Sequence, residues 1–255
     1  MNESITIITG ASSGVGREFA LQLDQSTEFN EFWLIAQDME GLEATAAKLK
    51  HESKLFAGDL TSETFEDELF TELEAKQPLV KILVNSAGVG FNSKFKETSL
   101  EANTLTLDLN IRALTRLTYK VLDYMAKGSR VFNIASVSSF MPQYKFSVYS
   151  ASKAYVLSFS RALNSEVKSQ GINVIAVCPN PLETNFKHGE KIKGIKRLGI
   201  EDVSTVVRTA IENSHYKKDI SVQSLLAHII RFISRILPHN WVLNFEAFLD
   251  KFNQD

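Results

Sequence analysis

The amino-acid sequence predicts an α/β fold in which one doubly wound parallel sheet carries helices on both faces. Short runs of apolar, often β-branched residues alternate six times with stretches of helical periodicity. A glycine-rich turn at residues 10–16 joins the first apolar run to the first helical stretch, which is the usual place of such a turn in these sheets. The length of 255 residues suits one large α/β domain or two small ones.

The elements follow in chain order from their composition. Apolar, β-branched runs predict strands at 5–9, 32–36, 54–57, 80–84, 131–135 and 172–178. Helical spacing predicts helices at 17–23 and 42–50, from Ser62 onward, as one long helix over 100–126, and over 154–168 before Gly171. Because strands and helices alternate, right-handed crossovers are expected.

The last part of the chain has a different pattern. Leucine, isoleucine and phenylalanine recur at helical spacing from residue 225 to 236, with His228, Arg231 and Arg235 opposite, and Pro238 ends this amphipathic helix. Apolar residues continue through 241–249. We expect a main domain over 1–222 and a helical extension over 223–255 packed on it. The alternatives are that this extension contacts a dimer mate, covers a substrate pocket or contacts a membrane surface.

Composition excludes several classes of protein. A formal net charge of -2 argues against nucleic acid as a partner, and the single cysteine, Cys178, excludes an internal disulfide and a multi-cysteine metal site. No metal is expected. The first residues lack the basic and apolar regions of a signal peptide, and no stretch of about 18 apolar residues is present. A cytoplasmic protein is the expectation.

The turn from Gly10 to Gly16 can bind a dinucleotide. Glycines allow close approach of a pyrophosphate to the backbone, and the helix that follows offers free N–H groups. A plain strand-to-helix turn is the alternative. Ala36 and Gln37 end the second strand, where a ribose would be recognised, and Asp38 is better interpreted as a helix N-cap. Asp59 either meets an adenine edge or caps the helix near Ser62.

A second cluster carries acid–base chemistry. Ser136 follows the fifth strand, and Tyr149 and Lys153 lie one turn apart if Tyr149 opens a helix. We expect the ammonium to lower the pKa of the phenol, which could then exchange a proton with a carbonyl or alcohol oxygen. Asn110, inside the predicted long helix, either bonds locally or opens the helix and holds a water. The alternative is that residues 149–153 are simply the polar start of a helix with a lysine on its surface.

Taken together, these residues resemble the short-chain dehydrogenase/reductase family, in its main branch of about 250 residues, from residue 4 to about 215. Residues 9–16 match its TGxxxGxG motif, and residues 85–88 match NNAG with Ser86 in place of the second asparagine. Asn110, Ser136, Tyr149 and Lys153 match its catalytic tetrad. The resemblance implies a Rossmann-like sheet and cofactor-binding residues Gly10, Ser12, Ser13, Gly14, Val15, Gly16, Gln37, Asp59, Leu60, Asn85, Ala87, Gly88, Tyr149, Lys153, Pro179, Leu182 and Thr184.

Two departures from the family pattern affect these expectations. Asn180-Pro181 stands where the family has a Pro-Gly step, and an asparagine with positive φ would keep the turn. Neither the acidic marker of NAD, expected at Ala36, nor the basic marker of NADP, expected at Gln37, is present. The absence of a repelling charge favours NADP slightly. Arg17 is either a phosphate partner or, as we prefer, a helix-surface residue.

The family mechanism is hydride transfer between NADP or NAD and a ketone or secondary alcohol. It implies Tyr149 as the general acid or base, Ser136 on the substrate carbonyl and a water held by Asn110 as a proton relay to Lys153. It also implies a homodimer or homotetramer formed through 100–126 and 150–168. A catalytically silent dinucleotide-binding or redox-sensing protein is the competing interpretation.

The substrate side is less defined. Residues 182–199 are predicted as a lid, and its basic residues outnumber its acidic ones by three, which favours an anionic substrate or else marks a solvated loop. The basic residues are Lys187, Lys191, Lys193, Lys196 and Arg197, and the acidic ones are Glu183 and Glu190. Phe140, Met141, Pro142 and Phe146 are expected to form an apolar pocket wall.

Overall fold

A computed structural model describes residues 3–182 and 199–252 and contains one parallel sheet with the strand order β3-β2-β1-β4-β5-β6-β7. The order reverses between β1 and β4, as a doubly wound sheet requires. The strands are β1 (Ser4–Thr9), β2 (Glu31–Ala36), β3 (Glu52–Ala57), β4 (Leu79–Asn85), β5 (Arg130–Ile134), β6 (Asn173–Val177) and β7 (Ile220–Ser221). Six strands were predicted. The seventh spans two residues, too few for a pattern to reveal it.

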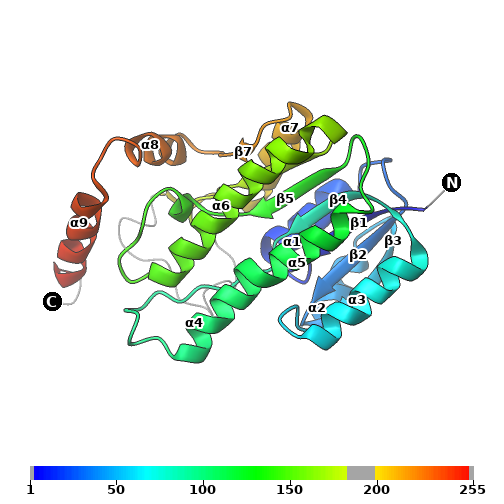
Figure 1. Cartoon of the computed structure of the whole chain (residues 1–255), viewed down its shortest axis with the longest axis horizontal. Coiled ribbons are helices and arrows are strands. Elements are labelled where there is room, and N and C mark those ends of the chain that lie inside the picture. The colour runs from blue at the N-terminus through cyan, green and yellow to red at the C-terminus, as the bar shows by residue number, and fades with distance from the viewer. Residues whose placement is uncertain (1–2, 183–198, 253–255) are drawn as a thin grey trace.

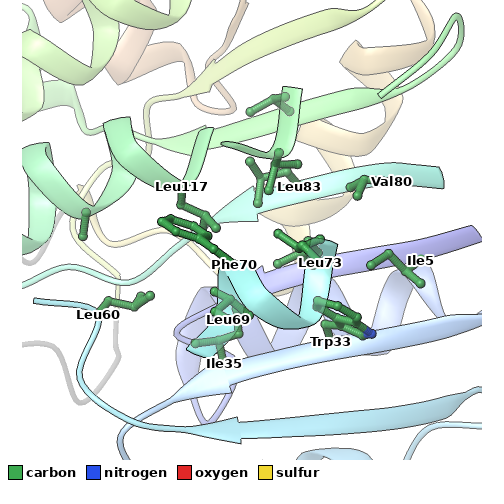
Figure 2. Close-up of a cluster of buried hydrophobic side chains, with 14 of the residues drawn as sticks. Ile5, Trp33, Ile35, Leu60, Leu69, Phe70, Leu73, Val80, Leu83 and Leu117 are labelled. Carbon is green, nitrogen blue, oxygen red and sulfur yellow. The ribbon is translucent and has the colours of Figure 1, made fainter. Parts of the chain in front are cut away.

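Helices cover both faces of this sheet, as predicted (Figure 1). Side chains of α3, α5 and α6 form one core cluster with the sheet, and side chains of α1, α2 and α7 form a second cluster on the opposite face. Figure 2 shows Phe70 and Leu73 of the first cluster between Leu83 and Trp33. The helices are α1 (Gly14–Leu23), α2 (Met39–Ala46), α3 (Glu63–Lys76), α4 (Leu100–Leu107), α5 (Leu114–Leu122), α6 (Ser147–Val167), α7 (Val203–His215), α8 (Leu225–Ile233) and α9 (His239–Phe252).

The register aligns the carboxyl ends of the central strands. Thr9 of β1 lies beside Asn85 of β4, Asn85 lies beside Asn133 of β5, and Asn133 lies beside Ala176 of β6. The loops that follow these strands therefore begin at one edge of the sheet. This edge is where a doubly wound sheet binds its ligands.

The helix predicted over 100–126 is continuous from Leu100 to Leu122, and its middle turn is π-helical. A π-helical turn, Asp108–Ala113, separates α4 from α5, and α5 ends at Leu122. The side chain of Asn110, at the centre of this turn, bonds outside the helix rather than within it. Turns of this kind are frequent at functional sites.

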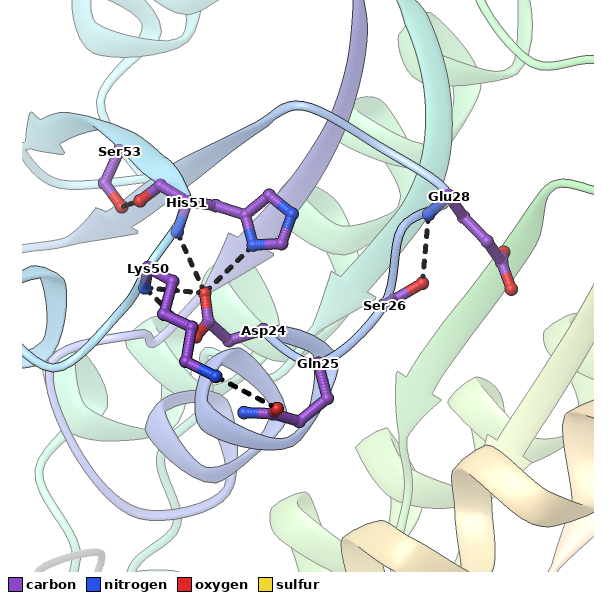
Figure 3. A network of polar contacts seen from close by, with 7 residues as sticks. All are labelled: Asp24, Gln25, Ser26, Glu28, Lys50, His51 and Ser53. Carbon is purple, nitrogen blue, oxygen red and sulfur yellow. Dashed lines mark hydrogen bonds and ion pairs between the residues drawn. The ribbon is translucent and has the colours of Figure 1, made fainter.

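Asp24 joins the end of α1 to the start of β3 on the side of the sheet away from the aligned strand ends (Figure 3). This buried carboxylate accepts hydrogen bonds from the backbone N–H groups of Lys50 and His51, at 2.9 and 3.1 Å, and from His51 Nδ1 at 3.0 Å. Burial raises its pKa, but the hydrogen bonds from His51 and Lys50 outweigh burial, so the net pKa is lowered.

The C-terminal extension begins where the Ser224 hydroxyl caps α8 by accepting from Ala227 N. Ala227 is buried, but the apolar stripe that we expected to pack on the domain is exposed. Leu225, Leu226, Ile229, Phe232, Ile236, Leu237, Trp241, Phe245 and Phe248 are all exposed. Figure 1 shows α8 and α9 at the end of the molecule far from α2 and α3. The boundary at residue 222 stays a prediction.

Candidate active site

The glycine turn after β1 has the backbone that its sequence requires. Gly10 and Gly14 have φ values of 66° and 52°, in the left-handed region. A Cβ at Gly16 would lie 2.3 Å from the carbonyl oxygen of Gly10, and a Cβ at Gly10 would lie 3.0 Å from Ala87 N. The turn is thus closely packed against the loop after β4 and leads into the N-terminus of α1. This arrangement fits the pyrophosphate of a dinucleotide.

Thr9 was not among the predicted site residues, although it ends β1. Its hydroxyl accepts hydrogen bonds from Ser86 N and Ala87 N, each at 3.0 Å. These bonds hold the 85–88 loop against the glycine turn. Its position directly before the first glycine of the turn could have identified Thr9 from the sequence.

The end of β2 carries neither an acidic nor a basic side chain at Ala36 and Gln37, where a ribose would be recognised. Ala36 is half-buried and Gln37 is exposed. Asp38 is the N-cap of α2 and accepts from Gly41 N at 3.1 Å, which confirms the interpretation of Asp38 as a cap. Arg17 is more than a surface residue, since its guanidinium donates to the Ser12 carbonyl and, at 3.0 Å, to Thr45 Oγ1. It braces the glycine turn against α2.

The predicted adenine side lies at the ends of β3 and β4. Asp59 accepts from both the backbone N–H and the hydroxyl of Thr61 at 2.8 Å, so it orders the turn before α3. Asn85 is buried and its Nδ2 donates to Thr118 Oγ1 and Asn133 Oδ1, which fixes this side chain inside the core. Leu60, Asn85 and Ala87 nevertheless line one small pocket together with Thr9, Leu109, Ala113, Leu114 and Leu117.

Asn110 clamps the loop after β4. Its Oδ1 accepts from Val89 N and its Nδ2 donates to the Val89 carbonyl, both at 2.9 Å. The same Nδ2 donates to Ser152 Oγ at 3.0 Å. Both amide hydrogens are therefore used, and only Oδ1 or the main chain remains for the water that we expected Asn110 to hold. The π-helical turn presents the amide to this loop.

Ser136 stands directly after β5 as the N-cap of a short 3₁₀ turn, Val137–Ser139. Its Oγ accepts from Ser138 N at 3.1 Å and forms a hydrogen bond with the side chain of Tyr149. Tyr149 is buried in the first turn of α6, as expected for a tyrosine that opens a helix. The structure thus brings the predicted serine and phenol into direct contact.

Lys153 lies one turn further along α6 and is also buried. Its Nζ donates to the Ile134 carbonyl at 2.7 Å and is 5.7 Å from the centroid of the Tyr149 ring. A Cβ at Gly88 would lie 3.5 Å from this Nζ and 3.0 Å from Asn110 Oδ1. The four residues of the predicted tetrad and Gly88 therefore surround one point at the carboxyl edge of the sheet.

We expected Lys153 to lower the pKa of Tyr149, and this expectation is wrong. Burial raises the pKa of the Tyr149 phenol to about 12, and the hydrogen bond with Ser136 offsets this only in part. Burial also lowers the pKa of Lys153 to about 8. The loss of hydration around a phenolate outweighs the amine, which is bonded to Ile134. At neutral pH, Tyr149 is a phenol that can donate its proton.

Polar and apolar residues together line the space beside Tyr149. A pocket there is lined by Phe91, Phe95 and Val148 together with polar residues such as Ser93 and Thr106. Phe146, one of the predicted wall residues, packs on the Tyr149 ring with centroids 4.3 Å apart. Phe140, Met141 and Pro142 are half-buried, and Phe140 packs against a third core cluster.

Gly90 was not predicted, although it lies two residues after Gly88. A Cβ at position 90 would lie 2.4 Å from Cδ2 of Tyr149. The close approach of this backbone to the ring fixes where the phenol can stand.

The loop after β6 is held by a buried cluster that was not predicted. The φ angle of Asn180 is not positive, so the positive φ that we expected at this residue is wrong. Instead, Glu201 accepts from Asn180 N at 3.0 Å and from Asn180 Nδ2 at 3.1 Å, and Asn180 Nδ2 donates to Ser224 Oγ at 2.7 Å. Glu201 also accepts from Ser224 N at 3.2 Å. The side chain of Asn180 thus stabilises the turn that a glycine would form.

This cluster connects the predicted cofactor side with α8. The Pro179 carbonyl accepts from Val137 N, next to Ser136, at 3.0 Å, and Leu182 pairs with Glu201 in an isolated parallel bridge. Thr184 and the basic residues of the predicted lid lie outside the described residues. Leu182 is the last described residue before this gap, and it is half-buried.

Known proteins resemble this chain over most of its length. A model of the family described as short chain dehydrogenase matches residues 4–193. The 17-beta-hydroxysteroid dehydrogenase type 3 of Mus musculus is 31% identical over 187 residues, covering 70% of this chain and 60% of that protein. A short-chain dehydrogenase from Sphingobium yanoikuyae in complex with NADPH is 25% identical with a TM-score of 0.77, covering 99% and 96% of the two chains.

A second solved structure has a similar extent of likeness. The bulky-bulky ketone specific alcohol dehydrogenase from Comamonas testosteroni is 25% identical with a TM-score of 0.74. The match covers 100% of this chain and 93% of that chain. The likeness therefore includes the sheet and the segment in which the tetrad-like residues meet.

Proposed function

This chain belongs to the short-chain dehydrogenase family and is an NAD(P)-dependent oxidoreductase, and we propose that it interconverts an apolar ketone and the corresponding secondary alcohol. The observation that carries this proposal is the contact between Ser136 and the buried Tyr149, with Lys153 Nζ 5.7 Å from the centroid of the phenol ring. A nicotinamide cofactor supplies the hydride, which no side chain can provide.

The residues of the chain have distinct tasks in this proposal. Tyr149 donates its proton to the carbonyl oxygen in reduction and accepts one in oxidation, and Ser136 binds the same oxygen. The ammonium of Lys153, buried one helical turn from Tyr149, replaces the proton that Tyr149 loses. Asn110 holds the Val89 main chain and, through its remaining acceptor sites, orders the water that leads from Lys153 to solvent.

The predicted cofactor residues fit a dinucleotide at this edge of the sheet. The glycine turn leads directly into the N-terminus of α1, where free backbone N–H groups can bind a pyrophosphate. We propose that Asp59 and Leu60 hold the adenine side and that Ala87 and Gly88 lie along the nicotinamide side. Thr184, expected at the carboxamide, lies outside the described residues.

We propose NADP as the preferred cofactor. Ala36 and Gln37 bring no carboxylate to the end of β2, and the carboxylate of Asp38 is engaged as the cap of α2. A 2'-phosphate there meets no free negative charge from these three residues. The similar chain from Sphingobium yanoikuyae, which was solved with NADPH, supports the same preference.

The lining beside Tyr149 combines polar and apolar side chains, and its aromatic part supports an apolar substrate. Phe91, Phe95 and Val148 line the pocket, and Phe146 packs on the phenol ring. Two similar proteins are named for a hydroxysteroid and for bulky ketones, which are substrates of this chemical character. An anionic group on the substrate stays a prediction, because the basic lid residues lie outside the described part of the chain.

A binding and turnover experiment tests this proposal. NADPH and NADH are titrated separately by fluorescence, and the preferred cofactor is then incubated with a series of ketones of increasing bulk. We expect tighter binding of NADPH and oxidation of the cofactor that is fastest with bulky apolar ketones. Binding of a cofactor without turnover of any ketone would instead identify a catalytically silent dinucleotide-binding protein.

A further inference from the structure

The C-terminal extension presents apolar side chains to the outside. Leu225, Phe232 and Ile236 follow one another at helical spacing through α8 and the turn after it, and they are 77%, 66% and 64% exposed. Trp241 and Phe245, one turn apart in α9, are 66% and 60% exposed. Two successive helices therefore expose large apolar side chains, more than the isolated exposed leucines that are normal on a protein surface.

The side of α9 that faces the domain includes acidic residues, and its outward side includes Trp241 and Phe245. Its acidic residues face the domain, where Glu246 accepts from Tyr144 N at 2.8 Å and Asp250 accepts from Lys145 Nζ at 2.6 Å. A surface helix of a globular protein turns its apolar stripe to the core and its charges to water. The apolar side of α9 therefore fits a second apolar environment outside the chain.

The charges of the extension indicate what that environment is. From Leu225 to Phe245 the sequence contains neither aspartate nor glutamate, whereas Arg231, Arg235, His228 and His239 lie in this stretch. Exposed aromatic side chains beside basic ones are the composition of a helix that lies in an anionic lipid surface.

We propose that α8 and α9 hold this protein on the surface of an anionic lipid bilayer, with Phe232, Trp241 and Phe245 inserted among the headgroups. Within residues 3–182 and 199–252, none of the helices is both long and apolar enough for a bilayer crossing, so the contact is peripheral. Because α9 bonds Tyr144 and Lys145, between Ser136 and Tyr149 in the sequence, the lipid lies near the substrate side of the site. The lipid contact does not depend on the proposed reaction.

Flotation with lipid vesicles tests this proposal on the full chain. Vesicles of phosphatidylcholine alone are compared with vesicles that also contain phosphatidylglycerol, at low and at high salt. We expect the protein to float with the anionic vesicles at low salt and to be partly released at high salt, because surface charges are screened. Absence of binding to anionic vesicles at low salt would overturn the proposal.

Variants identify the surface that binds. The triple variant Phe232→Ser, Trp241→Ser, Phe245→Ser should lower the ratio of bound to free protein by at least about tenfold, because it loses three aromatic side chains that leave water on binding. Arg235→Glu should lower it by about fivefold or more on anionic vesicles. A matched control, Leu100→Ser with Tyr119→Ser, removes side chains that are 73% and 74% exposed on α4 and α5 and should bind as the wild type does.

Two results contradict the assignment of this surface to lipid. One is vesicle binding by the triple variant equal to that of the control. The other combines three observations: the wild type forms a dimer in solution, the triple variant is monomeric, and neither binds vesicles. This outcome would show that the apolar surface of α8 and α9 binds a second copy of the chain. Thermal unfolding and ketone turnover, measured on every variant, show that the variants are folded.

Discussion

Gly90 lies directly against the ring of Tyr149, so that a Cβ at position 90 would stand 2.4 Å from Cδ2 of the tyrosine. Real Cβ atoms do not approach a carbon atom this closely. The loop that carries Gly90 is in turn clamped by Asn110, which bonds both main-chain groups of Val89. The position of the phenol is therefore set by three separate parts of the chain: α6, the loop after β4 and the π-helical turn.

The first prediction concerns this contact. Gly90→Ala must displace the Tyr149 ring, and a shift of about 1 Å at a reacting group costs about a hundredfold in rate. We expect kcat to fall by this order while the Kd of the cofactor changes little. Gly199→Ala is the matched control, because its Cβ meets only the mobile end of Leu226, at 3.0 Å. Equal turnover by the two variants would show that the ring position does not matter.

The second prediction concerns pH. Burial raises the pKa of Tyr149 to about 12 and lowers that of Lys153 to about 8. Below pH 8, Tyr149 is a phenol and Lys153 an ammonium, the state that donates a proton, so kcat/KM for ketone reduction should be level and then fall above about pH 8. Alcohol oxidation needs the phenolate and should rise with pH. Steady-state profiles in both directions check this, and reduction that accelerates above pH 8 would contradict it.

The third prediction concerns the Asn180–Glu201–Ser224 cluster. Glu201→Gln turns an NH₂ group toward the N–H donors of Asn180 and Ser224, and an unmatched buried group of this kind costs about 1–3 kcal/mol. We expect the cofactor KM to rise by about tenfold, equivalent to about 1.4 kcal/mol, with a smaller effect on kcat. Glu212→Gln, at an exposed position of α7, is the control. A lower melting temperature with an unchanged cofactor KM would restrict Glu201 to a structural role.

The fourth prediction concerns stability and the carboxylate of Asp24. Its folded pKa lies below the ordinary value of 3.8, so its hydrogen bonds stabilise the fold above that pH and are lost as pH falls through the folded pKa. Asp24→Asn should lower the free energy of unfolding by about 1–3 kcal/mol above about pH 5. Urea unfolding should show that the difference in free energy of unfolding between Asp24→Asn and the wild type shrinks below pH 3.8. The control variant Asp123→Asn, at an exposed position, should not differ from the wild type at any pH. A difference that is independent of pH would exclude the carboxylate as its source.

Local patterns were enough to predict most of the sheet. Each of β1, β2, β4, β5 and β6 is a buried apolar run, and its burial on both faces is what gives the run its composition. The glycine turn and the Tyr149–Lys153 pair were predicted because their spacing is local. The two-residue β7 escaped prediction, since pairing with β6 and not composition defines it.

What could not be predicted depends on contacts between distant residues. The π-helical turn at Asn110 is fixed by Val89 and Ser152, and the turn at Asn180 is fixed by Glu201, 21 residues later. The balance of burial against charge at Tyr149 likewise needs the packed structure. An amphipathic helix was predicted after residue 223, but its spacing does not reveal that its apolar side is exposed. Nor does spacing reveal that Glu246 of α9 accepts from Tyr144 N.

The central claim is that the Tyr149 hydroxyl donates the proton to a ketone beside a reduced nicotinamide. The most direct test is a single-turnover measurement with Tyr149→Phe and its matched control Tyr155→Phe. The control removes a hydroxyl from the same helix that forms a hydrogen bond with Thr115. We predict that Tyr149→Phe oxidises NADPH about a hundred to ten thousand times more slowly than the wild type and binds it equally well. Tyr155→Phe should match the wild type. Turnover by Tyr149→Phe at the rate of Tyr155→Phe would contradict the account.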